Sequence, residues 1–225
     1  MKLIYEGKTK DVYDNENGTL TLKLKDDATG KDGVFDPGEN AVGLSIEGLG
    51  RESLRLTAYY FELLNAKGIA SHFVSCDIAK SAMVVKSAKV FGKGIEFICR
   101  VKAAGSFVKR YNMYTKFGAD LNYLVEVTLK DDANNDPPVI KEMLTTLGIM
   151  TVEEYDTCVK LSKKAAKIIA DDLAKKELEL YDLKFEFGKS GNDILLIDEV
   201  SAGCMRVYKN GGIVPPLELG KLILG

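Results

Sequence analysis

The stretch YDLKFEFGKSGNDILLIDEV, residues 181–200, constrains the fold more than any other part of the chain, because it predicts a β-hairpin with one charged face. Its first half alternates charged and apolar side chains, which a strand directs to opposite faces. The charged side chains are those of Asp182, Lys184 and Glu186. The connection GKSGND is short, so the second half should pair back antiparallel and bring Asp198 or Glu199 beside the charged face.

This charged face has two interpretations. It is either a solvated strand surface with cross-strand ion pairs, or part of a binding site for an anionic ligand. The run from Ile194 to Ile197 is continuously apolar and predicts a buried strand, so acids at its end would lie at the edge of a core. Two carboxylates near such an edge, with a lysine between them, suit a magnesium–phosphate site, because the metal neutralises the acids and bridges phosphate oxygens.

The composition excludes several classes of function. The net charge is −2 and no basic block occurs, which argues against a nucleic-acid-binding protein. No segment has the apolar length of a membrane span, and the N-terminus lacks the apolar core of a signal peptide, so we expect a cytoplasmic protein with no membrane partner. The four cysteines show no paired CxxC spacing, which predicts reduced thiols and no zinc site. His72 is the only histidine, so a mechanism with two histidines is excluded.

The first part of the chain reads as strand-rich. The runs KLIYEGKTKDVYD and GTLTLKLKDDATG predict strands with turns at Gly18 and Gly30. The glycine-rich segment at residues 33–50 is typical of a loop. A helix is predicted from about Ser53 to Ala66, and the runs HFVSCDI and AMVVKSAKV predict two more strands.

The second part of the chain mixes helices and strands. The run GIEFICRVKAA predicts a strand, residues 138–147 predict a short helix, and Thr151 with Glu154 forms a capping box before a long helix that reaches about Lys176. The hairpin described above follows, and the chain then ends in a short tail. The pattern is α+β, with a strand-rich part at residues 1–87, a mixed part at residues 88–225, and a linker near residues 86–93.

The segment EGKTK lies between two predicted strands and has the residue types of a phosphate-binding turn. Gly7 would let the backbone approach an anion, while Lys8 and Lys10 alternate around Thr9. The GxxxxGK[ST] spacing of a Walker A loop is absent. An ordinary surface turn would have the same composition, so this motif alone does not decide between the two.

The segment EFICRVKAAGSFVKRY gathers further groups that bind anions. Glu96 and Arg100 share one face if the segment is a strand, and AAGS offers small residues and the hydroxyl of Ser106 where a ligand must approach closely. Lys109 and Arg110 follow directly. The alternative is an exposed strand and turn without a ligand.

Taken together, six blocks in this order resemble the SAICAR synthetase family, and the chain is identified as a divergent member. The blocks are LIYEGKTKDVY, LKDDATG, EFICRVKAAGSFVKRY, LKDDANNDPP, YDLKFEFG and IDEVSAGCMR, and they span nearly the whole chain. The resemblance implies a two-lobed α+β fold, with a kinase-like ATP cleft between a strand-rich N-terminal lobe at residues 1–87 and a mixed C-terminal lobe at residues 88–225.

The implied reaction is an ATP-dependent ligation in purine biosynthesis. It joins carboxyaminoimidazole ribonucleotide (CAIR) to the amino group of L-aspartate, with release of ADP and phosphate. A carboxylate is a poor electrophile, so phosphoryl transfer would first give an acyl phosphate that the amine attacks. That transfer needs positioning and cationic screening more than a protein nucleophile, which explains how a chain with one histidine could be an enzyme.

The resemblance also assigns roles to individual residues. Those implied to bind ATP are Gly7, Lys8, Lys10 and Lys86. The implied ligands of Mg²⁺ are Glu186 and Asp198. Those implied to hold the imidazole nucleotide and its phosphate are Glu96, Arg100, Ser106, Arg110, Asp182 and Arg206. Lys184 is placed between the phosphates and the second substrate, and the closing loop carries Lys130, Asp132 and Asp136.

The chain departs from the family pattern mainly in the substrate half. Ala202 and Gly203 stand where the family usually has a proline and an aspartate, which removes a carboxylate. The block EGLGRES replaces a lysine and two asparagines, with Glu47, Arg51 or Glu52 as possible substitutes for the lost group. The chain also lacks the family's usual last helix. We therefore expect the ATP half to match better than the substrate half.

Two alternatives to the SAICAR reaction follow from these departures. The first is a paralogous ligase or phosphotransferase that acts on another small carboxylate or phosphorylated substrate. The second is a nucleotide-binding module without catalysis, which the presence of both metal acids and both loop lysines disfavours. The expected partners are small molecules, and the resemblance leaves a homodimer open.

Overall fold

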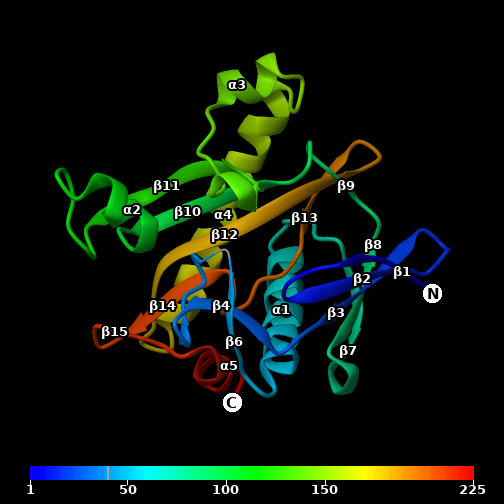
Figure 1. Cartoon of the computed structure of the whole chain (residues 1–225), viewed down its shortest axis with the longest axis horizontal. Helices are drawn as coiled ribbons and strands as arrows, with labels where there is room; N and C mark the ends of the chain where they lie inside the picture. The colour runs from blue at the N-terminus through cyan, green and yellow to red at the C-terminus, as the bar shows by residue number, and fades with distance from the viewer. Residues whose placement is uncertain (40) are drawn as a thin grey trace. The chain divides into compact units, whose positions relative to one another are not determined.

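The computed structural model describes residues 1–39 and 41–225 (Figure 1). The chain forms two compact units. Unit 1 comprises Met1–Ala88, Glu199–Cys204 and Val214–Gly225, and unit 2 comprises Lys89–Asp198 and Met205–Ile213. The predicted division into residues 1–87 and 88–225 differs from this one near the end of the chain, because two late segments return to unit 1.

Unit 1 contains an antiparallel sheet with the strand order β1-β2-β3-β8-β7. Its strands are β1 (Lys2–Glu6), β2 (Lys10–Asp14), β3 (Thr19–Leu24), β7 (Phe73–Asp77) and β8 (Ala82–Lys86). A smaller sheet has the order β5-β4-β6, with β4 at Asp27–Lys31, β5 at Val34–Phe35 and β6 at Val42–Ser45. Helix α1 (Leu49–Ala66) buries one side that includes Leu54, Leu56, Tyr60, Phe61 and Leu64. The short 3₁₀ turn η1 (Ile78–Lys80) connects β7 to β8.

The prediction of a turn at Gly30 is wrong because Gly30 lies inside β4, and the prediction of a loop at residues 33–50 is wrong for the residues that form β5, β6 and the start of α1. Residues 36–39 and 46–48 do connect these elements without regular structure, and residue 40 lies outside the described residues. A Cβ on Gly30 would lie 2.2 Å from the carbonyl oxygen of Val34, and one on Gly43 would lie 2.4 Å from the carbonyl oxygen of Gly30. These glycines therefore allow close approach between strands, which composition alone does not distinguish from a flexible loop.

Helix α1 begins four residues earlier than the predicted Ser53 because a side chain from outside the helix satisfies its N-terminus. The Asp26 carboxylate accepts hydrogen bonds from the N–H groups of Gly48 (3.0 Å) and Gly50 (2.9 Å). A carboxylate at this position also interacts favourably with the helix dipole. Two acids in the block LKDDATG are thus Asp26, which caps α1, and Asp27, which begins β4.

The predicted short tail contains regular structure that the sequence interpretation missed. Strands β14 (Met205–Lys209) and β15 (Gly212–Ile213) belong to unit 2, and helix α5 (Pro216–Leu224) packs against α1 in unit 1. A Cβ on Gly220 would lie 2.8 Å from the Glu52 carboxylate, so this glycine allows the two helices to approach closely. The packing of α5 on α1 is the reason that the chain end returns to unit 1.

Unit 2 is built on an antiparallel sheet with the order β11-β10-β12-β14-β15, in which β13 and β9 also pair with β12. The remaining strands are β9 (Lys89–Val90), β10 (Ile95–Lys102), β11 (Asp120–Leu129), β12 (Glu179–Ser190) and β13 (Asp193–Ile197). The helices are α2 (Gly105–Tyr111), α3 (Lys141–Thr146) and α4 (Val152–Ala174), with the 3₁₀ turn η2 at Asp132–Asn134. Helix α4 packs on β10, β11 and β12 (Figure 1).

The two strongest local predictions in unit 2 are confirmed. Strands β12 and β13 form the predicted hairpin, with Ser190 opposite Asp193. Thr151 and Glu154 form both hydrogen bonds of the capping box before α4. Helix α3 is shorter than predicted because Val139 donates its N–H to the Val127 carbonyl and so continues the sheet. Helix α2 was not predicted, since the segment before it read as a continuous strand.

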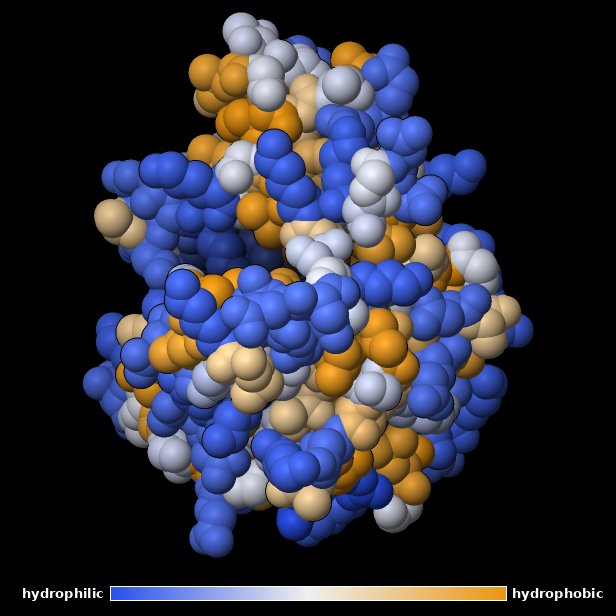
Figure 2. Space-filling model, turned by 90° about the vertical axis from the view of Figure 1, so that its right-hand side faces the viewer, coloured by the Kyte–Doolittle hydropathy of each residue, from blue (hydrophilic) through white to orange (hydrophobic). Residues whose placement is uncertain are grey.

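The exposed surface mixes apolar and polar side chains. Large exposed apolar side chains are spread over both units, and Figure 2 shows hydrophobic patches separated by hydrophilic surface on the face that it draws. Within the described residues, no helix combines the length and the apolar character that crossing a bilayer requires.

Candidate active site

The predicted charged face exists in unit 2, but it is largely buried. In the β10–β12 pair, Glu96 lies opposite Glu186 and Arg100 lies opposite Asp182. The exposed fraction is 6% for Glu96, 7% for Glu186 and 2% for Asp182. The interpretation as a solvated strand surface is therefore wrong for these acids, although the cross-strand ion pairs that it predicted do form. Burying so many ionised groups on one face is costly unless each has a partner.

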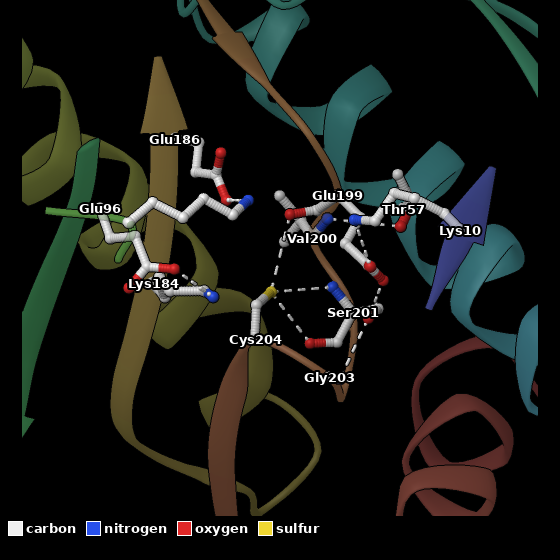
Figure 3. A network of polar contacts seen from close by, with 11 residues as sticks. Lys10, Thr57, Glu96, Lys184, Glu186, Glu199, Val200, Ser201, Gly203 and Cys204 are labelled. Atoms are coloured by element: carbon white, nitrogen blue, oxygen red, sulfur yellow. Dashed lines mark hydrogen bonds and ion pairs between the residues drawn. The ribbon is translucent and has the colours of Figure 1, made fainter. Parts of the chain in front are cut away.

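One group of polar residues on this face is the carboxylate–lysine cluster. Its members are Glu96, Lys130, Lys184, Glu186 and Asp198. The Lys184 ammonium donates to Glu96 Oε1 at 2.7 Å, and the Lys130 ammonium donates to Glu186 Oε1 at 2.7 Å. Figure 3 shows Glu96, Lys184 and Glu186 side by side on the two neighbouring strands. The second oxygen of Glu96 accepts a hydrogen bond from the Thr128 hydroxyl at 3.1 Å.

The charges of the cluster perturb one another. Burial raises the pKa of the Glu186 carboxyl, and the neighbouring Asp198 carboxylate raises it further, while Lys130 and Lys184 act in the opposite direction. Burial alone would lower the pKa of Lys184 and of Lys130, but the surrounding carboxylates outweigh it and raise both values. Both lysines therefore stay cationic, while the Asp198 carboxylate repels the ionised form of Glu186. Perturbed acids and bases of this kind are characteristic of functional sites.

The Glu186–Asp198 pair fits a divalent cation that a ligand also coordinates. Among the described residues, no three histidine, cysteine or acidic side chains gather closely enough to hold a metal by themselves. Magnesium is commonly bound by one or two carboxylates together with phosphate oxygens and water, so two acids suffice when the ligand is a phosphate. Asp198 has a φ of 69°, a left-handed conformation that aspartate tolerates better than most residues.

A second group on the same sheet is the arginine cluster. Its members are Arg100, Ser106, Arg110, Glu126, Asp182 and Arg206. Arg100 is 1% exposed and uses its whole fork: Nη1 donates to Asp182 at 2.9 Å, Nη2 donates to the Ser106 hydroxyl at 3.3 Å, and Nε donates to Glu126.

The outer members of the cluster complete a row of alternating charges. Arg206 Nη1 donates to Asp182 Oδ2 at 2.9 Å, and Arg110 Nη2 donates to Glu126 Oε1 at 2.6 Å. Gly105 has a φ of 53°, and a Cβ there would lie 2.6 Å from Cζ of Arg206. The glycine thus leaves room for the guanidinium beside Ser106. Two guanidinium groups and a hydroxyl in one place are the donors that a phosphate monoester requires.

The loop after β11 carries the three predicted residues Lys130, Asp132 and Asp136. Lys130 reaches Glu186, as described above. Asp132 is exposed on the 3₁₀ turn η2, and the Asp136 carboxylate accepts the N–H of Asp131 at 2.7 Å, which closes the loop on itself. Asp136 therefore has a structural role in this conformation.

The predicted nucleotide-binding residues of unit 1 fall into two places. Gly7 and Lys10 form a tight turn between β1 and β2, in which the Gly7 N–H donates to the Lys10 carbonyl at 2.9 Å. Lys8 is exposed on this turn. Lys86 lies at the opposite end of the sheet, since Lys10 pairs with Leu24 and Lys86 pairs with Thr19 at the two ends of β3. A single ligand could contact both places only if it extended along the sheet.

The sequence interpretation missed Glu126, and it did not predict the partner of Glu199. Glu126 links Arg100 to Arg110, and the alternation of Glu126 and Thr128 with Val125 and Val127 would have placed it on the polar face of a strand. Glu199 pairs with Lys10 at 2.8 Å within unit 1, a contact between residues far apart in the sequence that no local pattern predicts.

The residues that depart from the family pattern are also placed. Arg51 has a side chain that is 60% exposed, while the Glu52 side chain is 12% exposed and pairs with Arg55 at 3.0 Å. Because Asp26 caps α1, Arg51 is not needed there as a cap. Glu52 packs at the α1–α5 contact, so its position is explained by structure alone.

Comparisons with known proteins agree with the geometry. A sequence model of the SAICAR synthetase family matches residues 3–215. A phosphoribosylaminoimidazole-succinocarboxamide synthase from Clostridium tetani is 52% identical over 226 residues and aligns over 100% of both chains. One from Finegoldia magna is 36% identical, with coverage of 92% of this chain and 86% of the relative.

Solved structures give the same result. A SAICAR synthetase in complex with ADP has a TM-score of 0.82 and 30% identity, covering 93% of this chain and 86% of that one. The phosphoribosylaminoimidazole-succinocarboxamide synthase from Ehrlichia chaffeensis has a TM-score of 0.84 and 26% identity, covering 94% and 88%. The predicted α+β architecture is confirmed by this similarity.

Proposed function

The chain belongs to the SAICAR synthetase family, and we propose that it joins CAIR to L-aspartate in an ATP-dependent reaction that yields SAICAR, ADP and phosphate. This reaction is a carbon–nitrogen ligation of purine biosynthesis. The observation that carries the proposal is the presence of the carboxylate–lysine cluster and the arginine cluster on one buried sheet face within this family's fold.

Each unit, taken by itself, carries residues that we propose to bind ATP or its metal ion. In unit 1, the Gly7–Lys10 turn would hold phosphates with Lys8 and Lys10, and Lys86 would lie toward the adenine. In unit 2, Glu186 and Asp198 would hold Mg²⁺. When bound, that ion supplies positive charge to the phosphate oxygens. The raised pKa of Glu186 supports this assignment, because a cation would relieve the repulsion between the two acids.

The imidazole nucleotide would bind at the arginine cluster. Arg100, Ser106 and Arg206 would hold its phosphate, and Asp182 fixes both guanidinium groups. Arg110 would add positive charge near the phosphate from the exposed edge of the arginine cluster, and Glu96 would contact the imidazole ring. The cluster holds three guanidinium groups, those of Arg100, Arg110 and Arg206, but only two carboxylates, Asp182 and Glu126. The surplus of one positive charge supports a phosphate at this place.

The chemistry would proceed in two balanced steps. The γ-phosphoryl group passes from ATP to a carboxylate oxygen of CAIR and releases ADP, and the amine of L-aspartate then displaces phosphate and loses a proton. Lys184 would screen the charge between the carboxylate and the phosphate, and Lys130 with Asp132 would approach from the loop after β11. These residues position and neutralise the reactants, which is the main protein contribution to phosphoryl transfer.

A second candidate is the same ATP chemistry on another small carboxylate. Gly203 favours it, because a carboxylate usual in the family is missing from the substrate half. The buried clusters of unit 2 would be used in the same way in both cases. We also propose a cytoplasmic location. The absence of a disulfide among Cys76, Cys99, Cys158 and Cys204 supports it.

The test is ADP release by the purified protein with Mg·ATP, CAIR and L-aspartate, and with each omitted in turn. We expect release only when all are present. Turnover with CAIR that is indifferent to L-aspartate would exclude this amine and favour the second candidate. No ADP release with any acid and amine pair would reject the ligase proposal.

Substitution of Gly105 should affect the nucleotide selectively. In Gly105→Ala the new Cβ would lie within 2.8 Å of three atoms of the Arg206 guanidinium, so the arginine must move. We expect the KM for CAIR to rise about tenfold or more, because a displaced charge-assisted bond is worth about 1.5–3 kcal/mol. The KM for ATP should stay within twofold, roughly the scatter of uncoupled sites.

Gly191→Ala is the matched control for this experiment. Gly191 also has a positive φ, of 62°, but a Cβ there would meet no atom within 4 Å. It therefore carries the same backbone strain, of order 1 kcal/mol, without disturbing the arginine. Equal KM values for CAIR in the two variants would contradict the placement of Arg206 in the nucleotide site.

A further inference from the structure

The segment Glu199–Cys204 belongs to unit 1 and holds one of the proposed ATP-binding lysines. The Lys10 ammonium donates to Glu199 Oε1 at 2.8 Å. The side chains are 14% exposed for Lys10 and 10% exposed for Glu199, so this ion pair is largely shielded from water. Figure 3 shows the Lys10 side chain extended from its strand toward Glu199.

The second oxygen of Glu199 is also fixed. The Ser201 hydroxyl donates to Glu199 Oε2, and Ser201 Oγ itself accepts the N–H of Gly203 at 3.0 Å. Ser201 is completely buried. This chain of contacts, the relay, runs from Gly203 through Ser201 and Glu199 to Lys10. The relay engages both oxygens of the Glu199 carboxylate and so determines how the carboxylate is oriented toward the Lys10 ammonium.

The backbone of this segment is anchored to unit 1 as well. The Val200 N–H donates to the hydroxyl of Thr57 at 3.3 Å, and Thr57 is a fully buried residue of α1. The Ser201 N–H donates to the Cys204 sulfur at 3.2 Å (Figure 3). Two hydrogen bonds therefore hold the backbone of this segment in place, and one of them comes from a buried residue of α1.

We propose that Glu199 and Ser201 are positioning residues that hold the Lys10 ammonium in place for the ATP phosphates, an inference that rests on the proposed function of Lys10. A lysine side chain has many rotamers, and ordering it costs up to about 2 kcal/mol. If the protein already orders it, the nucleotide does not have to. An ammonium has three N–H donors, so its bond to Glu199 is compatible with donation to a phosphate.

The relay and simple charge balance predict opposite changes in ATP affinity when Glu199 is removed. If Glu199 only neutralised Lys10, its removal would leave more positive charge for ATP and would tighten binding. If Glu199 positions Lys10, its removal would weaken binding despite the added charge. A purely structural ion pair would change stability and leave the affinity of the folded protein unaltered.

The experiment is a double-mutant cycle on Mg·ATP affinity, measured by calorimetry with the full chain. We expect Ser201→Ala to weaken ATP binding roughly tenfold, as the loss of a bond to a charged group predicts. Lys10→Met should weaken it further. In the double variant, Ser201→Ala should add nothing to Lys10→Met, because Ser201 acts only through the lysine. At saturating ATP, kcat of Ser201→Ala should be nearly unchanged.

Ser162→Ala is the matched control, since Ser162 is also fully buried and its hydroxyl donates to the Cys158 carbonyl at 2.8 Å inside α4. It should leave ATP affinity unaltered. If Ser201→Ala does not fold, Glu199→Asp replaces it, because the shortened acid keeps its charge but cannot hold the same ammonium position.

Three outcomes would overturn the relay. These are unchanged or tighter ATP binding in Ser201→Ala and Glu199→Asp, additive losses in the double variant, and an effect of Ser162→Ala equal to that of Ser201→Ala. Failure of the wild-type protein to bind Mg·ATP would instead reject the proposed function and the relay with it. The wild-type measurement therefore separates the two kinds of failure.

Discussion

Glu186→Gln should reduce turnover about 1000-fold or more, and Asp198→Asn should do the same. The two acids are the proposed magnesium ligands, and metal-based charge stabilisation is worth several kcal/mol. Glutamine and asparagine keep the shape of each side chain, and asparagine also tolerates the left-handed φ of 69° at position 198. The steady-state rate of ADP release at saturating CAIR and L-aspartate is the measurement.

The same two variants should keep or raise the thermal midpoint. Burial and the Asp198 carboxylate raise the pKa of Glu186, so the ionised carboxylate is less favourable in the folded protein than in the unfolded chain. A neutral amide removes that repulsion, at the cost of the Lys130 contact. Adding Mg·ATP should raise the midpoint of the wild type and have little effect on either variant.

Asp156→Asn is the control for loss of an acid in unit 2. Asp156 pairs with Lys141 at 3.0 Å, but its side chain is 56% exposed and it lies outside both clusters. Its turnover should equal that of the wild type. A strong loss of stability in Glu186→Gln together with intact magnesium-dependent ATP binding would favour a structural ion pair over a metal site.

Local patterns predicted those parts of the fold that are determined by neighbours in the sequence. The β12–β13 hairpin follows from alternation and a short connection, and the cap of α4 follows from Thr151 and Glu154. The glycine-rich segment at residues 33–50 was predicted as a loop, and the reason that part of it forms strands is physical. Gly30 and Gly43 are needed where two backbones approach within contact distance, a requirement that appears only once the strands have paired.

In the candidate site too, the sequence predicted what depends on neighbouring residues and not what depends on distant ones. The residues of β10 and β12 could be assigned to one face from spacing, and the register of the two strands bears out that assignment. Their burial could not be predicted, since it depends on the segments that pack around the sheet. The role of Glu126 and the pairing of Glu199 with Lys10 were missed because each contact joins residues more than 20 positions apart in the sequence.

Arg100→Ala should combine the largest loss of stability with loss of the imidazole nucleotide. Arg100 is 1% exposed, and its removal leaves Glu126 and Asp182 with fewer partners beside the core. Breaking a buried ion pair from one side typically costs about 3–5 kcal/mol. For a chain of this size that corresponds to a fall of roughly 10 °C in the thermal midpoint. Calorimetry at a temperature where the variant is folded should show lost CAIR binding and ATP binding close to wild type.

Two further variants separate the structural part of this effect from the binding part. Arg110 is the outer partner of Glu126, and the Arg110 side chain is 35% exposed. Arg110→Ala should therefore cost at most about 1 kcal/mol of stability. Arg100→Lys keeps the charge but cannot serve three acceptors with a planar fork, so it should recover part of the stability and little of the CAIR affinity. If folded Arg100→Ala bound CAIR as the wild type does, Arg100 would be a scaffold for Asp182 and Glu126 only, and the phosphate would have to be held by Arg206 and Ser106 without it.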